Sequence, residues 1–252
     1  MAGKILVPGR PVASDSVSIP LEQYETWKAF QVFETLKHMV LLCIPFGEVI
    51  FGDTFGYLAA IIQKGWLLHY RGGGSITVHR NEFAMELLKH PTCEYLVMLD
   101  QDHAHPADIV ERLMMHALQD REKKIISGLN YRRGVPYEPM AYIRHGDKHR
   151  RYEGEFDGES LYSVDAVATC AMLVHRSVFE TIPGPWFEDN YKRYAEHVFS
   201  GEDLDFCRKA RNAGFKIWVD SSLTSPHRTT CWVDKAFYDA WREANEMPEE
   251  TS

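Results

Sequence analysis

Residues 95–102 read YLVMLDQD, a run of five apolar residues followed by two aspartates that flank a glutamine. A short, unbroken apolar run is typical of a strand that is buried on both faces of a parallel sheet. The pattern predicts a core strand over 95–99, with Asp100 at its carboxyl end and Asp102 just beyond it. In open α/β sheets ligands bind at this edge, so both aspartates fall where chemistry is expected.

Outward from this strand, apolar runs alternate with amphipathic segments along most of the chain. The predicted strands cover residues 40–45, 66–70, 95–99, 124–128, 140–143, 161–167, 171–175 and 216–219, and the predicted helices cover 21–38, 53–64, 77–89, 106–118 and 202–212. Strands that alternate with helices in this way predict an α/β domain with a mostly parallel central sheet flanked by helices. The charged segment 145–159 is predicted to project as a hairpin or a loop.

A chain of 252 residues can form one large α/β domain, but it is short for two full-sized domains joined by a linker. We divide it into an N-terminal leader and helix over residues 1–39, a main domain over 40–230, and a C-terminal helix or tail over 231–252. The first 20 residues of the leader contain several prolines and serines, which favour a flexible or surface-draped segment.

The composition of the chain argues against nucleic-acid binding and against a membrane span. The formal net charge is −8, and phosphate backbones bind dense cationic surfaces, so we expect no stable nucleic-acid partner. Five cysteines are scattered without a Cys-x-x-Cys pair, which favours a reduced, cytoplasmic compartment. The apolar stretches fall short of the ~20 residues that span a bilayer, so we expect a soluble protein without a membrane span.

The two aspartates are candidate metal ligands. Hard divalent cations such as Mg²⁺ or Mn²⁺ choose oxygen ligands and keep positions for water and substrate phosphates, so Asp100 and Asp102 would suit a metal-bridged diphosphate. The alternative is that Asp102 and His103 merely form a turn before the next helix. His103 and His105 also form a His-x-His pair, which beside aspartates could instead favour zinc.

A second group of carboxylates occurs at the start of the predicted 202–212 helix. Ser200 as the N-cap, with Asp203 three residues later, has the spacing of a capping box, so capping alone could explain the pattern. A helix N-terminus also lowers the pKa of nearby carboxylates, which would leave Glu202 or Asp203 ionised and able to take a proton from a hydroxyl. The two roles can belong to different members of the pair.

A loop histidine and three arginines complete the set of candidates. His227 follows the last predicted strand, in a loop at an end of the sheet. Arg80, Arg132 and Arg133 could neutralise a diphosphate, because arginine makes bidentate contacts with phosphate. Taken singly, each of these side chains is better explained by surface solvation.

Taken together and in their order along the chain, these sequence motifs resemble the family 2 type of glycosyltransferase with the GT-A fold, especially its compact phage and bacterial members. The resemblance spans about residues 40–228. It rests on LLCIP at 41–45, Arg80-Asn81, the strand and Asp-x-Asp motif at 95–102, Tyr131-Arg132-Arg133, ATCAMLV at 168–174, GEDLDFC at 201–207 and GFKIWV at 214–219. No single piece is specific, whereas the ordered set is.

The resemblance implies a hexosyltransferase-like enzyme that moves a sugar from a UDP- or GDP-linked donor to an unknown acceptor hydroxyl, with inversion at the anomeric carbon. It implies that Asp100, Asp102 and His227 hold Mn²⁺ or Mg²⁺. It also implies that Asp203, or otherwise Glu202, deprotonates the acceptor. The residues expected to bind the donor nucleotide and its diphosphate are Pro45, Arg80, Asn81, Asp100, Gln101, Arg132 and Arg133.

Two departures from the family pattern leave the substrates open. Many relatives carry an acidic residue after the second strand to grip the nucleobase or ribose, whereas this chain has Tyr70-Arg71 and three glycines. The segment 168–171 reads ATCA where a glycine-rich turn is common, so the acceptor pocket is equally open.

Two other functions fit parts of the pattern. One is a nucleotide-sugar-binding protein that keeps the fold without catalysis, and the presence of two separate carboxylate groups argues against it. The other is a metal-dependent hydrolase that uses His103, His105 and the aspartates, which leaves the 200–228 segment unexplained.

Overall fold

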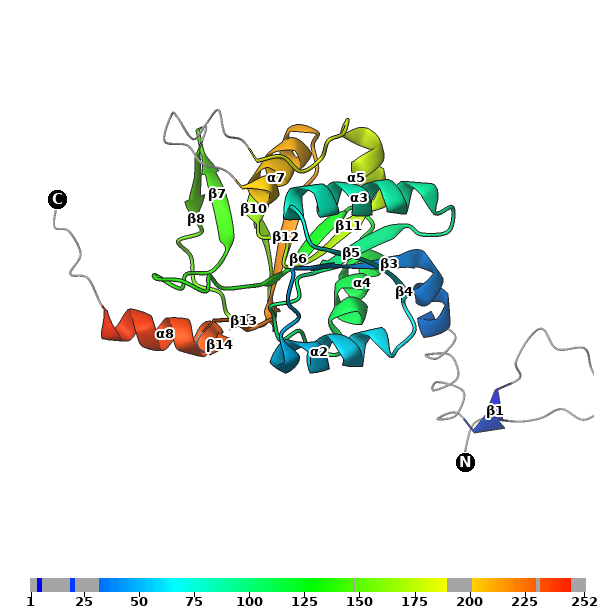
Figure 1. Ribbon diagram of the computed structural model, residues 1–252, viewed down its shortest axis with the longest axis horizontal. Helices are drawn as coiled ribbons and strands as arrows, with labels where there is room; N and C mark the ends of the chain where they lie inside the picture. The colour runs from blue at the N-terminus through cyan, green and yellow to red at the C-terminus, as the bar shows by residue number, and fades with distance from the viewer. Residues whose placement is uncertain are drawn as a thin grey trace, which may run out of the picture.

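The computed structural model describes residues 4–5, 19–20, 32–146, 148–189, 201–229 and 232–245. Its centre is a seven-stranded sheet of order β4-β3-β5-β11-β6-β12-β9 (Figure 1). The strands are β3 (Val40–Phe46), β4 (Leu67–Gly72), β5 (Tyr95–Leu99), β6 (Ile125–Leu129), β9 (Leu161–Val164), β11 (Ala171–His175) and β12 (Ile217–Thr224). β9 and β11 run antiparallel to the other five strands, which are parallel to one another.

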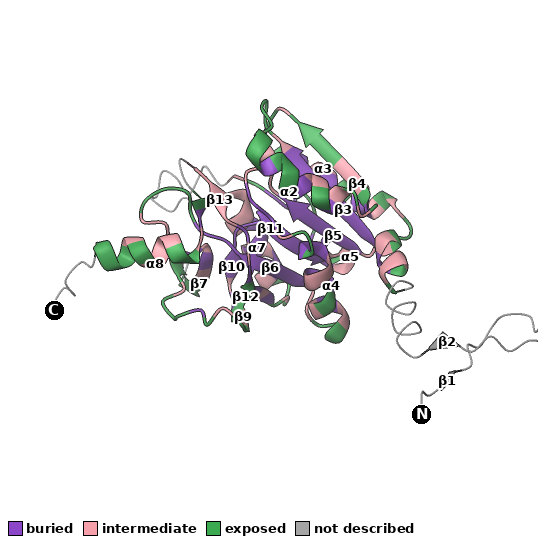
Figure 2. Ribbon diagram, turned by 90° about the horizontal axis from the view of Figure 1, so that it is seen from below, coloured by how far each residue is buried: buried purple, intermediate pink, exposed green. Residues whose placement is uncertain are grey.

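Helices cover both faces of this sheet (Figure 1). One face carries α2 (Gly52–Ile62) and α4 (Ile109–Gln119), and the other carries α3 (Ile76–Lys89), α5 (Arg176–Thr181) and α7 (Glu202–Asn212). Side chains alternate between the faces of a strand, so Leu42 of β3 packs in the layer of α2 and α4, and Leu41 in the opposite layer. The buried strands between half-exposed helices are visible in Figure 2. The expected mostly parallel α/β sheet flanked by helices is confirmed.

Burial on both faces explains why the core strands have near-continuous apolar sequences. β5 and β6 are buried along their whole length. Phe206 of α7 stacks on Phe187 and Phe179, with ring centroids 4.6 and 5.9 Å apart. These contacts anchor α7 to the core. This helix begins with the two predicted catalytic carboxylates.

Smaller elements lie outside the central sheet. They are the antiparallel sheet β10-β7-β8 (Ala166–Val167, Ala141–His145 and Lys148–Arg151), the strand pairs β1 with β2 (Lys4–Ile5 and Ile19–Pro20) and β13 with β14 (His227–Arg228 and Trp232–Val233), and helix α8 (Lys235–Ala244). β7 and β8 form a hairpin, so the prediction for the start of the 145–159 segment is confirmed.

The predicted single strand 161–167 is wrong, because the structure contains two strands there. β9 joins the central sheet and β10 joins the small one. Asp165 separates them: its backbone N–H donates to Tyr142 O (2.9 Å) and its carboxylate accepts from the Arg144 backbone N–H (2.7 Å). The chain therefore leaves one sheet for the other at a polar residue inside an apolar run.

The last core strand extends further than the apolar pattern predicts. β12 continues to Thr224 through polar residues that are nevertheless buried, such as Asp220 and Ser221. Asp220 accepts a hydrogen bond from His116 Nε2 (2.9 Å) of α4, which makes its burial tolerable. A sequence pattern based on apolar residues ends at Val219 for this reason.

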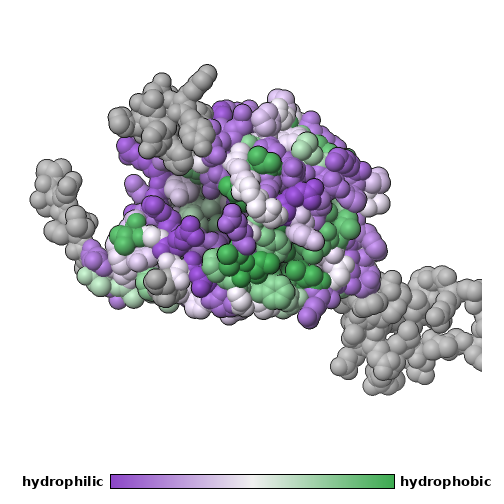
Figure 3. Space-filling view, in the orientation of Figure 1, coloured by the Kyte–Doolittle hydropathy of each residue, from purple (hydrophilic) through white to green (hydrophobic). Residues whose placement is uncertain are grey.

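The surface and the N-terminal region add two observations. On the face shown in Figure 3, apolar side chains gather over α2, where Phe55 and Tyr57 are exposed. Residues 32–39 are helical, and the rest of the predicted 21–38 helix lies outside the described residues. Within the described part of the chain, no helix has the length and apolar character needed to cross a membrane.

Candidate active site and metal centre

The predicted site lies beyond the carboxyl end of β5. Asp100 directly follows this strand, and the loop after it pairs with β13, more than a hundred residues further along the chain. The backbone N–H of Arg228 donates to Asp102 O (2.8 Å), and His103 forms an isolated β-bridge with His227. Backbone pairing therefore brings the Asp-x-Asp motif and His227 together.

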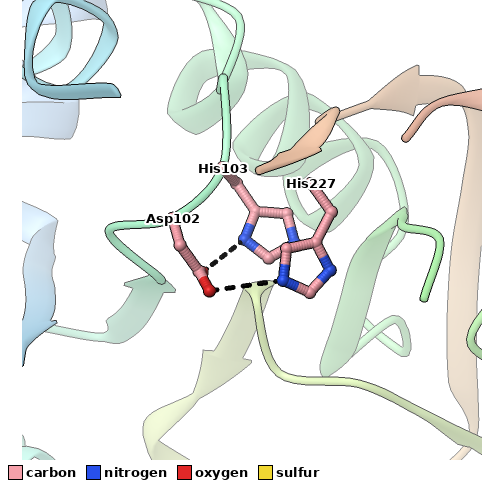
Figure 4. A group of neighbouring side chains, drawn as sticks. All are labelled: Asp102, His103 and His227. Atoms are coloured by element: carbon pink, nitrogen blue, oxygen red, sulfur yellow. Dashed lines mark hydrogen bonds and ion pairs between the residues drawn. The ribbon is translucent and has the colours of Figure 1, made fainter. Parts of the chain in front are cut away.

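Asp102, His103 and His227 form a group whose possible ligand atoms all lie within 4.8 Å of one another (Figure 4). Asp102 Oδ1 is 3.0 Å from His103 Nδ1, and Asp102 Oδ2 is 3.3 Å from His227 Nε2. Burial alone would raise the pKa of Asp102, but hydrogen bonds from both histidines outweigh it and hold this pKa well below its usual value. The group is an anionic centre suited to a divalent cation.

His227 has the orientation expected of a metal ligand. Its Nδ1 lies 3.0 Å from Tyr131 O, and a carbonyl oxygen can only accept, so Nδ1 carries the proton. The other nitrogen, Nε2, faces Asp102 Oδ2 at 3.3 Å and is the atom left to bind a metal ion. A backbone carbonyl that fixes the far nitrogen of a ligating histidine is a recurrent arrangement in metal sites.

His105 has a structural role. It is fully buried, its Nε2 donates to Asp100 O (2.8 Å), and its Nδ1 accepts from the Ser225 hydroxyl (2.9 Å). Burial lowers its pKa to about 3, so the ring is neutral at physiological pH. Both nitrogens are used in holding the loop after β5.

Asp100 is paired with Arg80 rather than included in the metal group. Arg80, on α3, is 4% exposed and donates through Nη2 to Asp100 Oδ2 (3.1 Å) and through Nη1 to Glu202 Oε1. Burial would lower the pKa of Arg80, but the charges of Asp100 and Glu202 raise it. Arg80 therefore ties the Asp-x-Asp motif to the start of α7.

Glu202 and Asp203 are the first two residues of α7. The helix has Gly201 as its N-cap, without a side-chain capping bond, and Ser200 lies outside the described residues. Asp203 Oδ1 instead accepts from the Leu204 N–H (2.7 Å). The predicted capping box is therefore replaced by a glycine cap, which accounts for neither carboxylate.

The expectation that the helix N-terminus lowers the pKa of these carboxylates is wrong. Burial raises the pKa of Glu202 and of Asp203, and in both it outweighs the opposing charge of Arg80. The cost of desolvation exceeds the stabilisation that the helix end and Arg80 provide. A carboxylate with a raised pKa is a stronger base, which suits proton abstraction near neutral pH.

Of the remaining residues predicted to bind the donor, Arg133 contacts the metal group, and Arg132, Gln101 and Pro45 have other surroundings. Arg133 is largely exposed, with Nη1 3.4 Å from Asp102 Oδ2, whereas Arg132 points to Glu138 (3.4 Å). Gln101 has a buried Oε1 without a hydrogen-bond partner among the described residues. Pro45 is buried in β3, in register with Arg71 of β4.

Asn81 is fully occupied within the protein. Its Nδ2 donates to Thr77 O (2.8 Å) and Phe187 O (2.7 Å), and its Oδ1 accepts from the backbone N–H groups of Trp186 (2.8 Å) and Phe187 (3.2 Å). These bonds hold the segment after α5 against α3. The side chain has no remaining hydrogen-bonding capacity for a donor.

No protein-family model matches the chain, and no curated protein matches it. Solved structures do match. A197 from STIV aligns with a TM-score of 0.55 and 17% identity, over 75% of this chain and 85% of that chain. GalNAc-T7, in a structure with UDP, GalNAc and Mn²⁺, aligns with a TM-score of 0.48 and 11% identity, over 96% of this chain and 63% of that chain.

A structure of CMP:2-keto-3-deoxy-manno-octonic acid synthetase complexed with CTP aligns with a TM-score of 0.43 and 12% identity, over 82% of this chain and 99% of that chain. At such identities the similarity concerns the fold alone. The sheet order and the helical layers make this protein an α/β protein with a mostly parallel central sheet, and its fold is similar to that of A197 over 85% of that chain.

Proposed function

We propose that this protein is a metal-dependent glycosyltransferase that moves a sugar from a nucleoside-diphosphate sugar to an acceptor hydroxyl, with inversion at the anomeric carbon. One observation carries the proposal: Arg80 joins Asp100 of the Asp-x-Asp loop to Glu202 of α7, the residue before Asp203. The loop that carries the candidate metal group and the helix that carries the candidate base are thereby linked at the carboxyl edge of one sheet, where α/β proteins bind their ligands.

The donor end of the site would be formed by the loop after β5 and by His227. Asp102 and His227 would hold Mn²⁺ or Mg²⁺, with Asp100 beside them, fixed by Arg80. The metal, when bound, supplies Lewis-acid stabilisation of the negative charge that develops on the departing diphosphate. Arg133 has an exposed guanidinium next to Asp102 and would contact a phosphate oxygen.

The acceptor end would be formed by α7. Asp203 takes the proton of the acceptor hydroxyl as the acceptor oxygen bonds to the anomeric carbon of the sugar. The bond between that carbon and the diphosphate oxygen breaks, and the nucleoside diphosphate leaves with the electron pair. Glu202 is held by the guanidinium of Arg80, which leaves Asp203 as the freer of the two bases.

The geometry disfavours the two rival functions. A hydrolase that uses His105 as a metal ligand would need one of its ring nitrogens, and both already have hydrogen-bond partners. A protein that only binds nucleotide sugars has no need for a second group of carboxylates on α7, tied through Arg80 to the Asp-x-Asp loop.

A screen of nucleotide sugars tests the proposal. The purified protein is incubated with UDP- and GDP-linked sugars and Mn²⁺, and release of nucleoside diphosphate to water or to added acceptors is measured, together with thermal stabilisation. We expect at least one donor to stabilise the wild type only when Mn²⁺ is present, and we expect Asp102→Ala to lose this stabilisation. Absence of any metal-dependent nucleotide binding would contradict the proposal.

A further inference from the structure

His103 has no role in the transfer described above. Its side chain is 1% exposed, and its Nδ1 faces Asp102 Oδ1 at 3.0 Å. Its other nitrogen, Nε2, is buried and has no hydrogen-bond partner among the described residues. A buried polar atom without a partner is unfavourable, so the position calls for an explanation.

The comparison with His105 shows that burial alone does not account for this state. Both rings come from the same loop and both are buried, yet each nitrogen of His105 has a partner. His103 instead stacks on His227, with ring centroids 4.0 Å apart and an interplanar angle of 24°. The loop satisfies one histidine within the protein and holds the other beside a predicted metal ligand.

The carboxylate of Asp102 lies along the nitrogen-bearing edges of both stacked rings (Figure 4). Two imidazoles and one carboxylate form a donor set that differs in chemistry from two carboxylates. Imidazole nitrogen favours transition-metal ions such as Co²⁺ and Zn²⁺, whereas Mg²⁺ selects oxygen ligands. The carboxylate of Asp100, which would make the set richer in oxygen, is engaged by Arg80.

We propose that His103 is a third protein ligand, so that Asp102, His103 and His227 form a two-histidine, one-carboxylate centre that selects transition-metal ions over Mg²⁺. The inference deepens the proposed function, since the same ion would face the donor diphosphate. The centre itself needs no nucleotide. His105 acts only by positioning the loop that carries His103.

Metal titration without nucleotide tests this assignment. Co²⁺ is added to the wild type, to His103→Gln and to a control, His90→Gln, whose side chain lies on the surface at the end of α3. Affinity is measured by calorimetry, and coordination by the visible absorption of Co²⁺. We expect His103→Gln to weaken Co²⁺ binding roughly tenfold or more, with the control unchanged and with millimolar Mg²⁺ unable to displace Co²⁺ from the wild type.

A spectroscopic readout keeps the inference testable even if His103→Gln does not fold. Pulsed electron paramagnetic resonance of wild-type protein loaded with Mn²⁺ detects nitrogen nuclei bound to the ion. We expect two coordinating imidazoles. A single coordinating imidazole, an unchanged Co²⁺ affinity in His103→Gln, or displacement of Co²⁺ by Mg²⁺ would overturn the proposal. Because no nucleotide is used, failure of sugar transfer would leave this result unaffected.

Discussion

Arg80 is the residue on which the acidic groups of the site converge. Its guanidinium is buried between Asp100 and Glu202, and its Nε has no partner among the described residues. Buried carboxylates are tolerated only when a counter-charge lies close. Arg80 therefore contributes to the stability of the site before any ligand binds, in addition to the donor contact that its sequence position predicts.

We expect Arg80→Met to lower the free energy of unfolding by about 3–5 kcal/mol, because it leaves two carboxylates without their buried counter-charge. Arg71→Met is the matched control, since Arg71 pairs with Glu82 at the surface and such exposed pairs contribute at most about 1 kcal/mol. Urea denaturation at neutral pH measures both. Similar small losses in the two variants would show that Arg80 does not stabilise the site.

Asp203 gives a prediction for the pH dependence of transfer. A general base must be ionised, and burial raises the pKa of Asp203 above its ordinary value of 3.8. The rate therefore falls as the pH drops through this raised pKa. We expect the acidic limb of the kcat/KM profile to have its midpoint above pH 3.8, and a midpoint at or below that value would assign the base role elsewhere.

The types of the site residues could be predicted from the sequence, but their pairings could not. The position of Asp100 and Asp102 followed from the apolar run before them, because strand ends are readable from periodicity. The pairing of Asp100 with Arg80, and of Asp102 with His103, depends on side-chain directions that only the packed loops fix. The Nε2 of His103, which is buried without a partner in the described part of the chain, left no signal in the sequence.

At the scale of elements, helix α5 begins with an unusual cap. His175, the last residue of β11, accepts a hydrogen bond at Nδ1 from the Ser177 backbone N–H (3.1 Å). Burial, followed by the charges of Lys124, Arg121 and Arg176, lowers the pKa of His175 to about 4. Protonation of Nδ1 would remove the acceptor that caps the helix.

The cap predicts a loss of stability in acid. The unfolded chain takes up a proton at His175 near pH 6.5 and the folded protein only near pH 4, so the stabilisation is complete above about pH 6.5 and lost as the pH falls toward 4. Between pH 6.5 and pH 4 the free energy of unfolding of the wild type should fall further than that of His175→Asn, by at most about 3 kcal/mol. Asparagine still offers an oxygen that can accept the capping hydrogen bond, but it does not titrate. Equal pH dependence would contradict this assignment.

Element boundaries show which signals the sequence carries. β5, β11 and α7 have the predicted bounds, because apolar runs mark the two strands and Gly214 follows the end of the helix. α4 begins at Ile109 rather than at Pro106, since the residues between them form turns. β12 and the 161–167 segment differ from prediction because Asp220 and Asp165 form buried or strand-breaking hydrogen bonds that depend on residues distant in the sequence.

For the whole molecule, the site exists because four distant parts of the chain meet at one edge of the sheet. α3 contributes Arg80, the loop after β5 contributes Asp102, α7 contributes Asp203 and β13 contributes His227. The α/β class could be predicted from the alternation of strands and helices. The antiparallel insertion of β11 between β5 and β6 could not, since an apolar strand has the same sequence pattern in either direction.

Two variants test most directly the claim that one site has a metal-bound donor end and a separate base on α7. With Mn²⁺ present, nucleoside diphosphate binding is measured by calorimetry, and its release from the matching nucleotide sugar by turnover, for the wild type, Asp102→Asn and Asp203→Asn. We expect Asp102→Asn to lose binding, and Asp203→Asn to bind as the wild type does while turning over at least about a hundredfold more slowly. Wild-type turnover in Asp203→Asn, or unchanged binding in Asp102→Asn, would contradict the claim.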